Sequence, residues 1–413
     1  MSRDKKKLQS ELANTEGTNS AIETKMLPVS ESDPDDTLET ETKNGPRVFF
    51  VHLEPLSSNL NQTLVLARAL SEDGWDIHIV CTESCSLVKS ANSYSLTLHT
   101  LPDGIAPSLM TAWKLTRIVG KEWRNDLKKK RNKHATVKSK GLVHACDPTA
   151  SQLVSKAWRI DKNLRIVHTR RVPIMEVNAN AVRCYQIPPA KVITDSLAGK
   201  IALRLSGLEA HNLHAIACGI DPAAYILRTN RKDGRVIFVV TLELASDRGY
   251  SLLFEALDIL DKTDGMPPWE LRILGEGPSF PDILKEAQDK NVAERLAFLG
   301  GLNAADQLSQ CDILVLPASE GESHVPLILQ GWAAHIPVIA INRLDHAEIL
   351  QDEGNALLVQ PNAAAALANQ MIRLANDNDL RAKLTVGGKE ALSKFPLTNM
   401  ILEHKRLYGQ IMA

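Results

Sequence analysis

The fold is decided by residues 235–241, which read Arg-Val-Ile-Phe-Val-Val-Thr. Five consecutive apolar residues, four of them β-branched, are typical of a strand that is buried on both faces, as in a parallel sheet. A helical pattern starts at Tyr250, and short apolar runs then alternate with helical stretches as far as residue 341. Strands that alternate with helices predict right-handed crossover units and a parallel sheet.

The same alternation fills the first half of the chain. We expect strands at 47–52, 76–81, 141–144, 164–169, 192–194, 213–217, 235–241, 271–274, 296–299, 312–316 and 338–341, and helices at 60–72, from 250, at 304–310 and at 325–334. The polar stretch 219–234, which contains Pro222, predicts a linker between the halves. The sequence therefore predicts an α/β protein with two Rossmann-like, doubly wound domains facing a cleft. Ligands bind at the carboxyl ends of such strands.

Composition narrows the class of protein. Of 413 residues, 44% are hydrophobic, and 48 Lys and Arg balance 49 Asp and Glu. This balance argues against a nucleic-acid binder, where a basic excess is expected. No run of about 18 apolar residues predicts a membrane span, and no apolar segment follows Lys5–Lys7 as in a signal peptide. We expect a cytoplasmic protein whose six cysteines are free thiols; Cys81 and Cys85 lack the second ligand pair of a zinc site.

Residues 1–45 differ from the rest in having no Phe, Trp or Tyr and an acidic cluster between Glu31 and Glu41. Such a segment cannot bury enough apolar surface to offset its ordering entropy, so we expect a disordered acidic tail. A metal site at Asp33 and Asp35 is less favoured, because a flexible segment does not preorganise ligands.

A helix predicted at 109–128 has two distinct faces. One is apolar, with Leu115, Val119, Trp123 and Leu127, and the opposite one is basic, with Lys114, Arg117, Lys121, Arg124 and Lys128. The basic face fits either a solvated surface or docking on an anionic membrane, which would place the protein peripherally at the inner face. Nucleic-acid binding is less favoured because no aromatic residues interleave with the basic ones.

An ordered series of motifs occupies the second half. Leu274-Gly275-Glu276-Gly277-Pro278 follows a strand and opens a helix, where an anion can approach the backbone. Residues 295–300, 311–317, 319–322, 337–340 and 354–359 continue the series. In its order and spacing it resembles the nucleotide-sugar domain of retaining glycosyltransferases with the GT-B fold, family 4. The resemblance runs from about Arg47 to Tyr408.

The resemblance implies transfer of a sugar from a nucleoside diphosphate sugar to a glycan or lipid-linked acceptor of the cell envelope, as in lipopolysaccharide core assembly. It implies retained configuration and no metal, and no cofactor besides the donor. It also assigns residues 46–221 to an acceptor domain, 222–396 to a nucleotide-sugar domain, and 397–413 to a helix that returns to the first domain.

The same resemblance assigns the donor site. A diphosphate held without Mg²⁺ needs basic side chains and a helix amino end. Here Arg248-Gly249 keeps one basic position, while Glu243 stands where the family has an arginine. Of the family's two carboxylates, the first falls on Glu322, with Glu320 as a less favoured alternative, and the second is replaced by Gln330. Further donor contacts are expected from Gly275, Glu276, Gly277, Ser58 and Asn61.

The first half departs further from the family. The loop at 58–62 has no glycine, and Cys146 replaces the active-site histidine of the family's His-x-His, with His144 expected to face the core. Asp147 is the candidate to take over a polar role, so the predicted catalytic set is Glu322, Asp147 and Cys146. Arg170 and Arg171 are the candidate cations for an acceptor or phosphate group, with structural ion pairs as the alternative.

These departures leave a second hypothesis open. The chain can be an intact GT-B fold without catalysis that acts as a binding or scaffold partner. A nucleotide-sugar epimerase of the same fold is less favoured, because no set of carboxylates and histidines for acid–base catalysis is found in the first half.

Overall fold

The computed structural model describes residues 45–54, 60–88, 91, 94, 96–130, 141–171, 182–187, 190–226, 234–241, 249–300, 304–318, 323–343 and 346–413, with the backbone alone for 125–130 and 304. Residues 1–44 of the predicted acidic tail lie outside these ranges, as do Ser58, Glu243, Arg248, Glu320 and Glu322.

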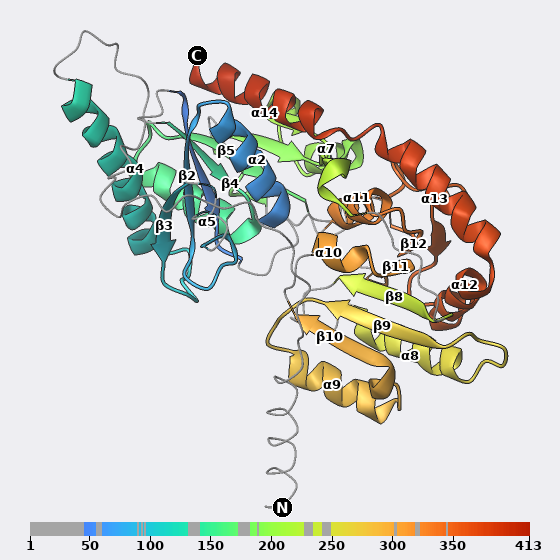
Figure 1. The fold of residues 1–413 in the computed structure, drawn as a ribbon. Coiled ribbons are helices and arrows are strands. Elements are labelled where there is room, and N and C mark those ends of the chain that lie inside the picture. Colours follow the sequence, from blue (N-terminus) through green and yellow to red (C-terminus); the bar gives the residue numbers. More distant parts are fainter. Residues whose placement is uncertain are drawn as a thin grey trace, which may run out of the picture. The chain divides into compact units, whose positions relative to one another are not determined.

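The first sheet has seven parallel strands in the order β3-β2-β1-β4-β5-β6-β7 (Figure 1). Their bounds are β1 Arg47–His52, β2 Asp76–Thr82, β3 Thr97–Leu101, β4 Leu142–Ala145, β5 Arg165–Thr169, β6 Lys191–Thr194 and β7 Leu213–Ala215. The second sheet has six parallel strands in the order β10-β9-β8-β11-β12-β13. Their bounds are β8 Val236–Thr241, β9 Trp269–Leu274, β10 Leu296–Gly300, β11 Ile313–Leu316, β12 Val338–Ile341 and β13 Leu357–Val359.

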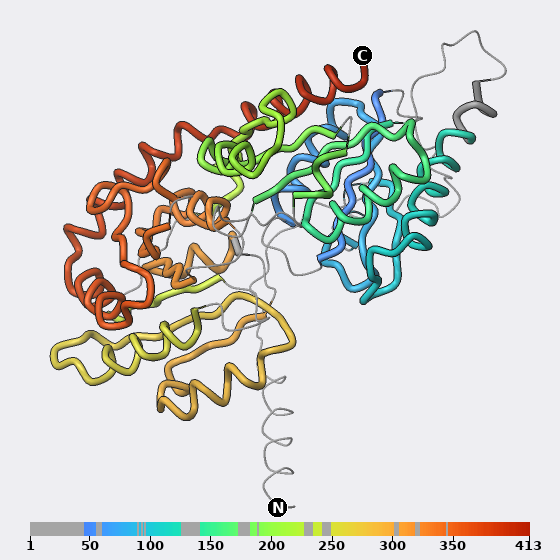
Figure 2. Tube along the Cα trace, turned by 180° about the vertical axis from the view of Figure 1, so that it is seen from behind, coloured from blue at the N-terminus to red at the C-terminus, as the bar shows by residue number. Residues whose placement is uncertain are grey.

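Helices connect the strands as the alternation predicts. Those of the first part are α2 Leu60–Glu72, α4 Leu109–Lys130, α5 Pro148–Ile160 and α7 Leu197–Leu205. Those of the second part are α8 Tyr250–Asp261, α9 Phe280–Asp289, α10 Ala304–Leu308, α11 Val325–Ala333, α12 Ala364–Asn376, α13 Asn378–Leu392 and α14 Leu397–Met412. Each sheet is built from one contiguous stretch of chain, the first blue to green and the second yellow to orange-red in Figure 2. The two-sheet α/β fold is therefore confirmed.

The continuous apolar runs are explained by burial on both faces. In β1, Val48 and Phe50 join one hydrophobic cluster, whereas Phe49 and Val51 join another. Successive side chains of a strand point to opposite faces, so a sheet covered by helices on both sides needs an apolar residue at every position.

Two strands are absent from the sequence-based prediction. β3 reads Thr-Leu-His-Thr-Leu and is an edge strand, so four of its five residues are exposed or only partly buried and it lacks a continuous apolar run. β13 has three residues, too few for a periodicity to show.

The last helix, α14, packs on the first sheet. Met400, Leu407 and Tyr408 join the hydrophobic cluster of Val48 and Phe50. A Cβ at Gly219 would lie 2.8 Å from the Met400 Cβ, so glycine allows the two segments to cross closely. Among the helices of the described ranges, none is long and apolar enough to cross a bilayer.

Candidate functional site

The second sheet changes direction between β8 and β11. The chain adds β9 and β10 on one side of β8, and β11, β12 and β13 on the other. Ligands of open α/β sheets bind at the carboxyl ends of the strands next to such a switch point. The residues after β8 and after β11 are therefore the primary candidates.

Gly249 joins the two sides of this switch point. It precedes α8 in the left-handed conformation (φ 89°), and a Cβ there would lie 2.8 Å from the Pro317 carbonyl oxygen, just after β11. Gly249, the residue before α8, has no side chain with which to cap the first turn. The amino end of α8 thus begins beside the end of β11, with amide groups suited to an anion.

The predicted donor-site residues Arg248 and Glu322 lie outside the described residues, but each borders a described residue at this edge. Gly249 follows Arg248, and Ser323 follows Glu322. The Ser323 amide donates to the Arg171 carbonyl (2.8 Å), which holds Ser323 beside the end of β5. Gln330 lies in the second turn of α11 and is buried, where a neutral amide needs no counter-charge.

The glycine-rich stretch 275–277 lies at the carboxyl ends of β9 and β10. The Gly275 amide donates to the Gly300 carbonyl (2.9 Å), and a Cβ on Gly300 would lie 3.3 Å from Glu276 Oε1. Gly277 accepts from the Phe280 amide at the start of α9. These residues stand one strand away from the switch point, and their contact with the donor stays a prediction.

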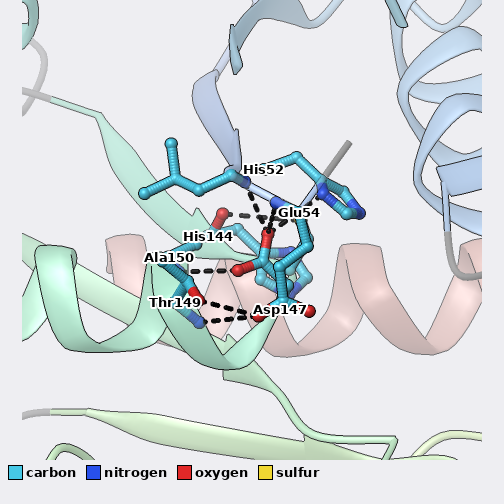
Figure 3. A network of polar contacts seen from close by, with 8 residues as sticks. His52, Glu54, His144, Asp147, Thr149 and Ala150 are labelled. Atoms are coloured by element: carbon cyan, nitrogen blue, oxygen red, sulfur yellow. Dashed lines mark hydrogen bonds and ion pairs between the residues drawn. The ribbon is translucent and has the colours of Figure 1, made fainter. Parts of the chain in front are cut away.

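In the first sheet the switch point lies between β1 and β4, and Asp147 occupies it (Figure 3). Its carboxylate accepts from the amides of Leu53 (2.6 Å) and Ala150 (2.7 Å) and lies 3.0 Å from His52 Nδ1. Burial opposes ionisation, but the His52 contact and the two amides prevail and lower the pKa of Asp147. These bonds give Asp147 a structural part as the N-cap of α5; a direct catalytic contact stays a prediction.

A second carboxylate reaches the same helix end. Glu54 Oε1 accepts from the amide (3.2 Å) and the hydroxyl (2.8 Å) of Thr149 (Figure 3). The amino end of α5 therefore binds two acidic side chains, Asp147 and Glu54. Neither His52 nor Glu54 was singled out from the sequence. Their positions at the end of β1 were the available signal.

Cys146 lies in the apolar interior. Its thiol joins the hydrophobic cluster around Val48, and burial raises its pKa to about 12. A protonated, enclosed thiol is a poor nucleophile, so these surroundings lend no support to the predicted catalytic role.

His144 is buried, as predicted, and its ring joins α14 to the sheet. One ring nitrogen lies 2.6 Å from Tyr408 Oη and the other 2.6 Å from Thr169 Oγ1. Burial lowers the pKa of His144 well below its usual value, so the ring is neutral, with one nitrogen donating and the other accepting.

Asn61 is the described member of the pair Ser58 and Asn61. Burial raises the pKa of the nearby Tyr225 hydroxyl to about 12, and the Asn61 side chain opposes that rise. The neighbouring Gln62 Nε2 donates to the Gly219 carbonyl (3.2 Å). The start of α2 therefore holds the 219–225 segment, and a donor contact by Asn61 stays a prediction.

Arg170 and Arg171 both lie at the carboxyl end of β5 and are buried. Tyr185, whose hydroxyl accepts from Arg170 Nη1 (3.3 Å), was not singled out from the sequence. Within the described part of the chain, no three His, Cys, Asp or Glu residues lie together as a metal-ligand set.

Residues 233–377 match the family model for glycosyl transferases group 1. They form a group 1 glycosyltransferase domain. The whole described chain also has the GT-B fold: a crystal structure of HepE from Anabaena in complex with UDP and glucose is similar, with a TM-score of 0.71, 14% identity, and coverage of 88% of this chain and 100% of that one.

Two curated relatives are similar to part of this chain. A GDP-mannose-dependent alpha-(1-6)-phosphatidylinositol monomannoside mannosyltransferase of Mycobacterium tuberculosis is 30% identical over 183 residues, which cover 41% of this chain and 46% of that protein. An exopolysaccharide phosphotransferase of Streptomyces coelicolor is 25% identical over 149 residues, 36% of this chain and 16% of that protein. The matched stretch thus spans less than half the length of either relative.

Proposed function

We propose that the protein transfers a sugar from a nucleoside diphosphate sugar to a glycan or lipid-linked acceptor of the cell envelope, with retention and without a metal ion. The observation that carries the proposal is the meeting of Gly249 and Pro317 at the switch point of a domain that matches group 1 glycosyltransferases. The named proteins support the substrate classes. The HepE structure holds UDP and glucose, and the mycobacterial enzyme is a GDP-mannose-dependent phosphatidylinositol monomannoside mannosyltransferase.

In this proposal the amino end of α8 and Arg248 hold the diphosphate. Negative charge grows on the leaving diphosphate during transfer, and fixed amides and a guanidinium stabilise it without a metal. Glu322 accepts hydrogen bonds from the donor sugar, and Gln330 accepts from the ribose.

Donor binding is the first test. Thermal shifts are measured with UDP, GDP, ADP and CMP and their common sugar conjugates. A ligand that binds only the folded protein, at 100 times its Kd, stabilises it by about 2.7 kcal/mol. A shift with one diphosphate supports the proposal. No shift with any of them, from a folded sample, contradicts it and favours the non-catalytic homologue.

The catalytic assignment is tested with Glu322→Ala, with Glu320→Ala as the matched control two residues away. We expect turnover to be abolished in the first variant and retained in the second, with the thermal midpoints of both close to that of the wild type. Turnover that survives Glu322→Ala refutes the assignment of the donor site.

We also propose that α4 docks on an anionic membrane. Leu115 and Val119 are buried, as predicted, while Lys114, Arg117, Lys121 and Arg124 are exposed; the Lys128 side chain lies outside the described set. The first turn adds exposed apolar side chains on the same side, Leu109 (64%), Met110 (70%) and Trp113 (49%). Exposed apolar residues followed by basic ones suit the boundary between acyl chains and headgroups.

Liposome sedimentation tests this surface. Vesicles with anionic lipid are expected to pull the protein down at low salt and release it at high salt, because screening weakens the attraction. Neutral substitutions at Lys114, Arg117, Lys121 and Arg124 should abolish the effect. Unchanged sedimentation of that variant contradicts the proposal.

A further inference from the structure

The two arginines after β5 leave the chain on opposite sides, as alternation along an extended segment dictates. Arg170 Nη1 donates to Tyr185 Oη (3.3 Å), and its guanidinium carbon lies 5.8 Å from the centre of that ring. Arg171 lies toward Cys146 and Cys218. Burial raises the pKa of both thiols, and Arg171 is near enough for its positive charge to oppose that rise. The two side chains therefore serve different surroundings.

Three described side chains near Arg170 are neutral. His168 packs edge-on against the Tyr185 ring (5.1 Å, 76°), and burial lowers its pKa to about 3. Burial also raises the pKa of Tyr185 above its usual value and that of Cys184 to about 11. At neutral pH none of the three carries a charge that could balance the guanidinium.

No carboxylate pairs with Arg170 among the residues that the structure describes, and its Nε has no hydrogen-bond partner there. The residue is only 6% exposed. An arginine side chain keeps its charge in proteins, so it cannot relieve burial by losing a proton. A buried cation without a counter-charge is unfavourable, and a bound anion would remove the imbalance.

Two helix amino ends at this edge, those of α5 and α7, are already occupied by carboxylates. Asp147 and Glu54 fill the start of α5. At the start of α7, Glu348 accepts from the amides of Leu197 (3.0 Å) and Ala198 (2.5 Å). Helix amino ends attract anions, but these two hold carboxylates of the chain itself. Arg171 also has a partner of its own.

We propose that Arg170, oriented by Tyr185, binds an oxyanion of the acceptor, a phosphate or a carboxylate. The planar guanidinium can meet two oxygens of such a group at once. The assignment to the acceptor rests on the proposed transferase function, whereas the anion site itself does not.

Calorimetric titration with inorganic phosphate and with malonate tests the site in the full-length protein. Charged hydrogen bonds of this kind correspond to about ten- to hundredfold in affinity, so Arg170→Gln should weaken binding of the preferred anion by that factor. Arg159→Gln, which changes an exposed arginine of α5, should bind it like the wild type. Binding of the nucleoside diphosphate found by thermal shift should be equal in all three proteins.

Stability of the unliganded protein distinguishes a ligand-binding arginine from a structural one. Removing an unbalanced charge should leave the thermal midpoint of Arg170→Gln unchanged or raise it, whereas a structural role predicts a fall. Arg170→Lys keeps the charge without the planar fork and should bind the anion with intermediate affinity. If the glutamine variant does not fold, Arg170→Lys and Tyr185→Phe carry the same comparison.

The proposal is overturned if neither anion binds the wild type, or if Arg170→Gln binds as tightly. It is also overturned if that variant loses nucleoside diphosphate in parallel, which would place Arg170 in the donor site. Loss of anion binding in Arg170→Gln, with no nucleotide bound by any variant, upholds the anion site and refutes the transferase.

Discussion

The hydroxyl of Tyr408 offers a quantitative test of how α14 is held. Tyr408→Phe removes the oxygen that lies 2.6 Å from His144 Nδ1 but keeps the ring, which packs 6.0 Å from Trp75 and in the cluster of Val48. No cavity forms, so the cost is that of the lost hydrogen bond. His144 is fully buried, and a buried polar atom left without a partner costs about 1–3 kcal/mol.

A loss of about 2 kcal/mol corresponds to a fall in Tm of about 4–8 °C for a domain of 150–250 residues. Calorimetry and urea unfolding measure it, with Tyr94→Phe as the control because Tyr94 is 40% exposed. Surface changes of that kind are usually within about 0.5 kcal/mol. A midpoint for Tyr408→Phe equal to that of Tyr94→Phe refutes the argument that the His144–Tyr408 bond holds the helix.

Three further predictions concern pH, the switch point and the ribose contact. Burial lowers the pKa of His404, in α14, to about 4, so between about pH 6.5 and pH 4 the unfolded chain binds more protons than the folded one. On going from pH 7 to pH 5 this group alone should lower the free energy of unfolding, measured in urea, by about 2 kcal/mol, and the buried His144 and His168 add to the fall. A flat profile contradicts the burial. Gly249→Ala should destabilise more than Gly207→Ala, because both have φ near 90° but a Cβ meets Pro317 only at Gly249; equal midpoints would argue against that close packing. Gln330→Glu should tighten binding of the nucleoside diphosphate by about tenfold, or about 1.4 kcal/mol. Calorimetric titration measures this change, and weaker binding shows that residue 330 does not face the ribose.

Local patterns were sufficient for much of the fold. The runs at Val48–Val51 and Val236–Val240 alternate between two buried faces, and that requirement is written into each run separately. The strands β1, β8 and β12 and the helix α2 accordingly lie where the sequence predicts them, to within a residue. Glycine at 249 and the basic face of α4 were also visible in the sequence, because each depends on neighbours within a turn or two.

The tertiary structure decided which polar side chains are already engaged. Asp147 and Leu53 are 94 residues apart, and His144 and Tyr408 are 264 apart, so no local pattern could show that these groups bond each other. The sequence presented Arg170 and Arg171 as equivalent cations. Only the packing of β5 between its neighbours distinguishes them. It places Arg170 beside the neutral Tyr185 and turns Arg171 to the opposite face of the sheet.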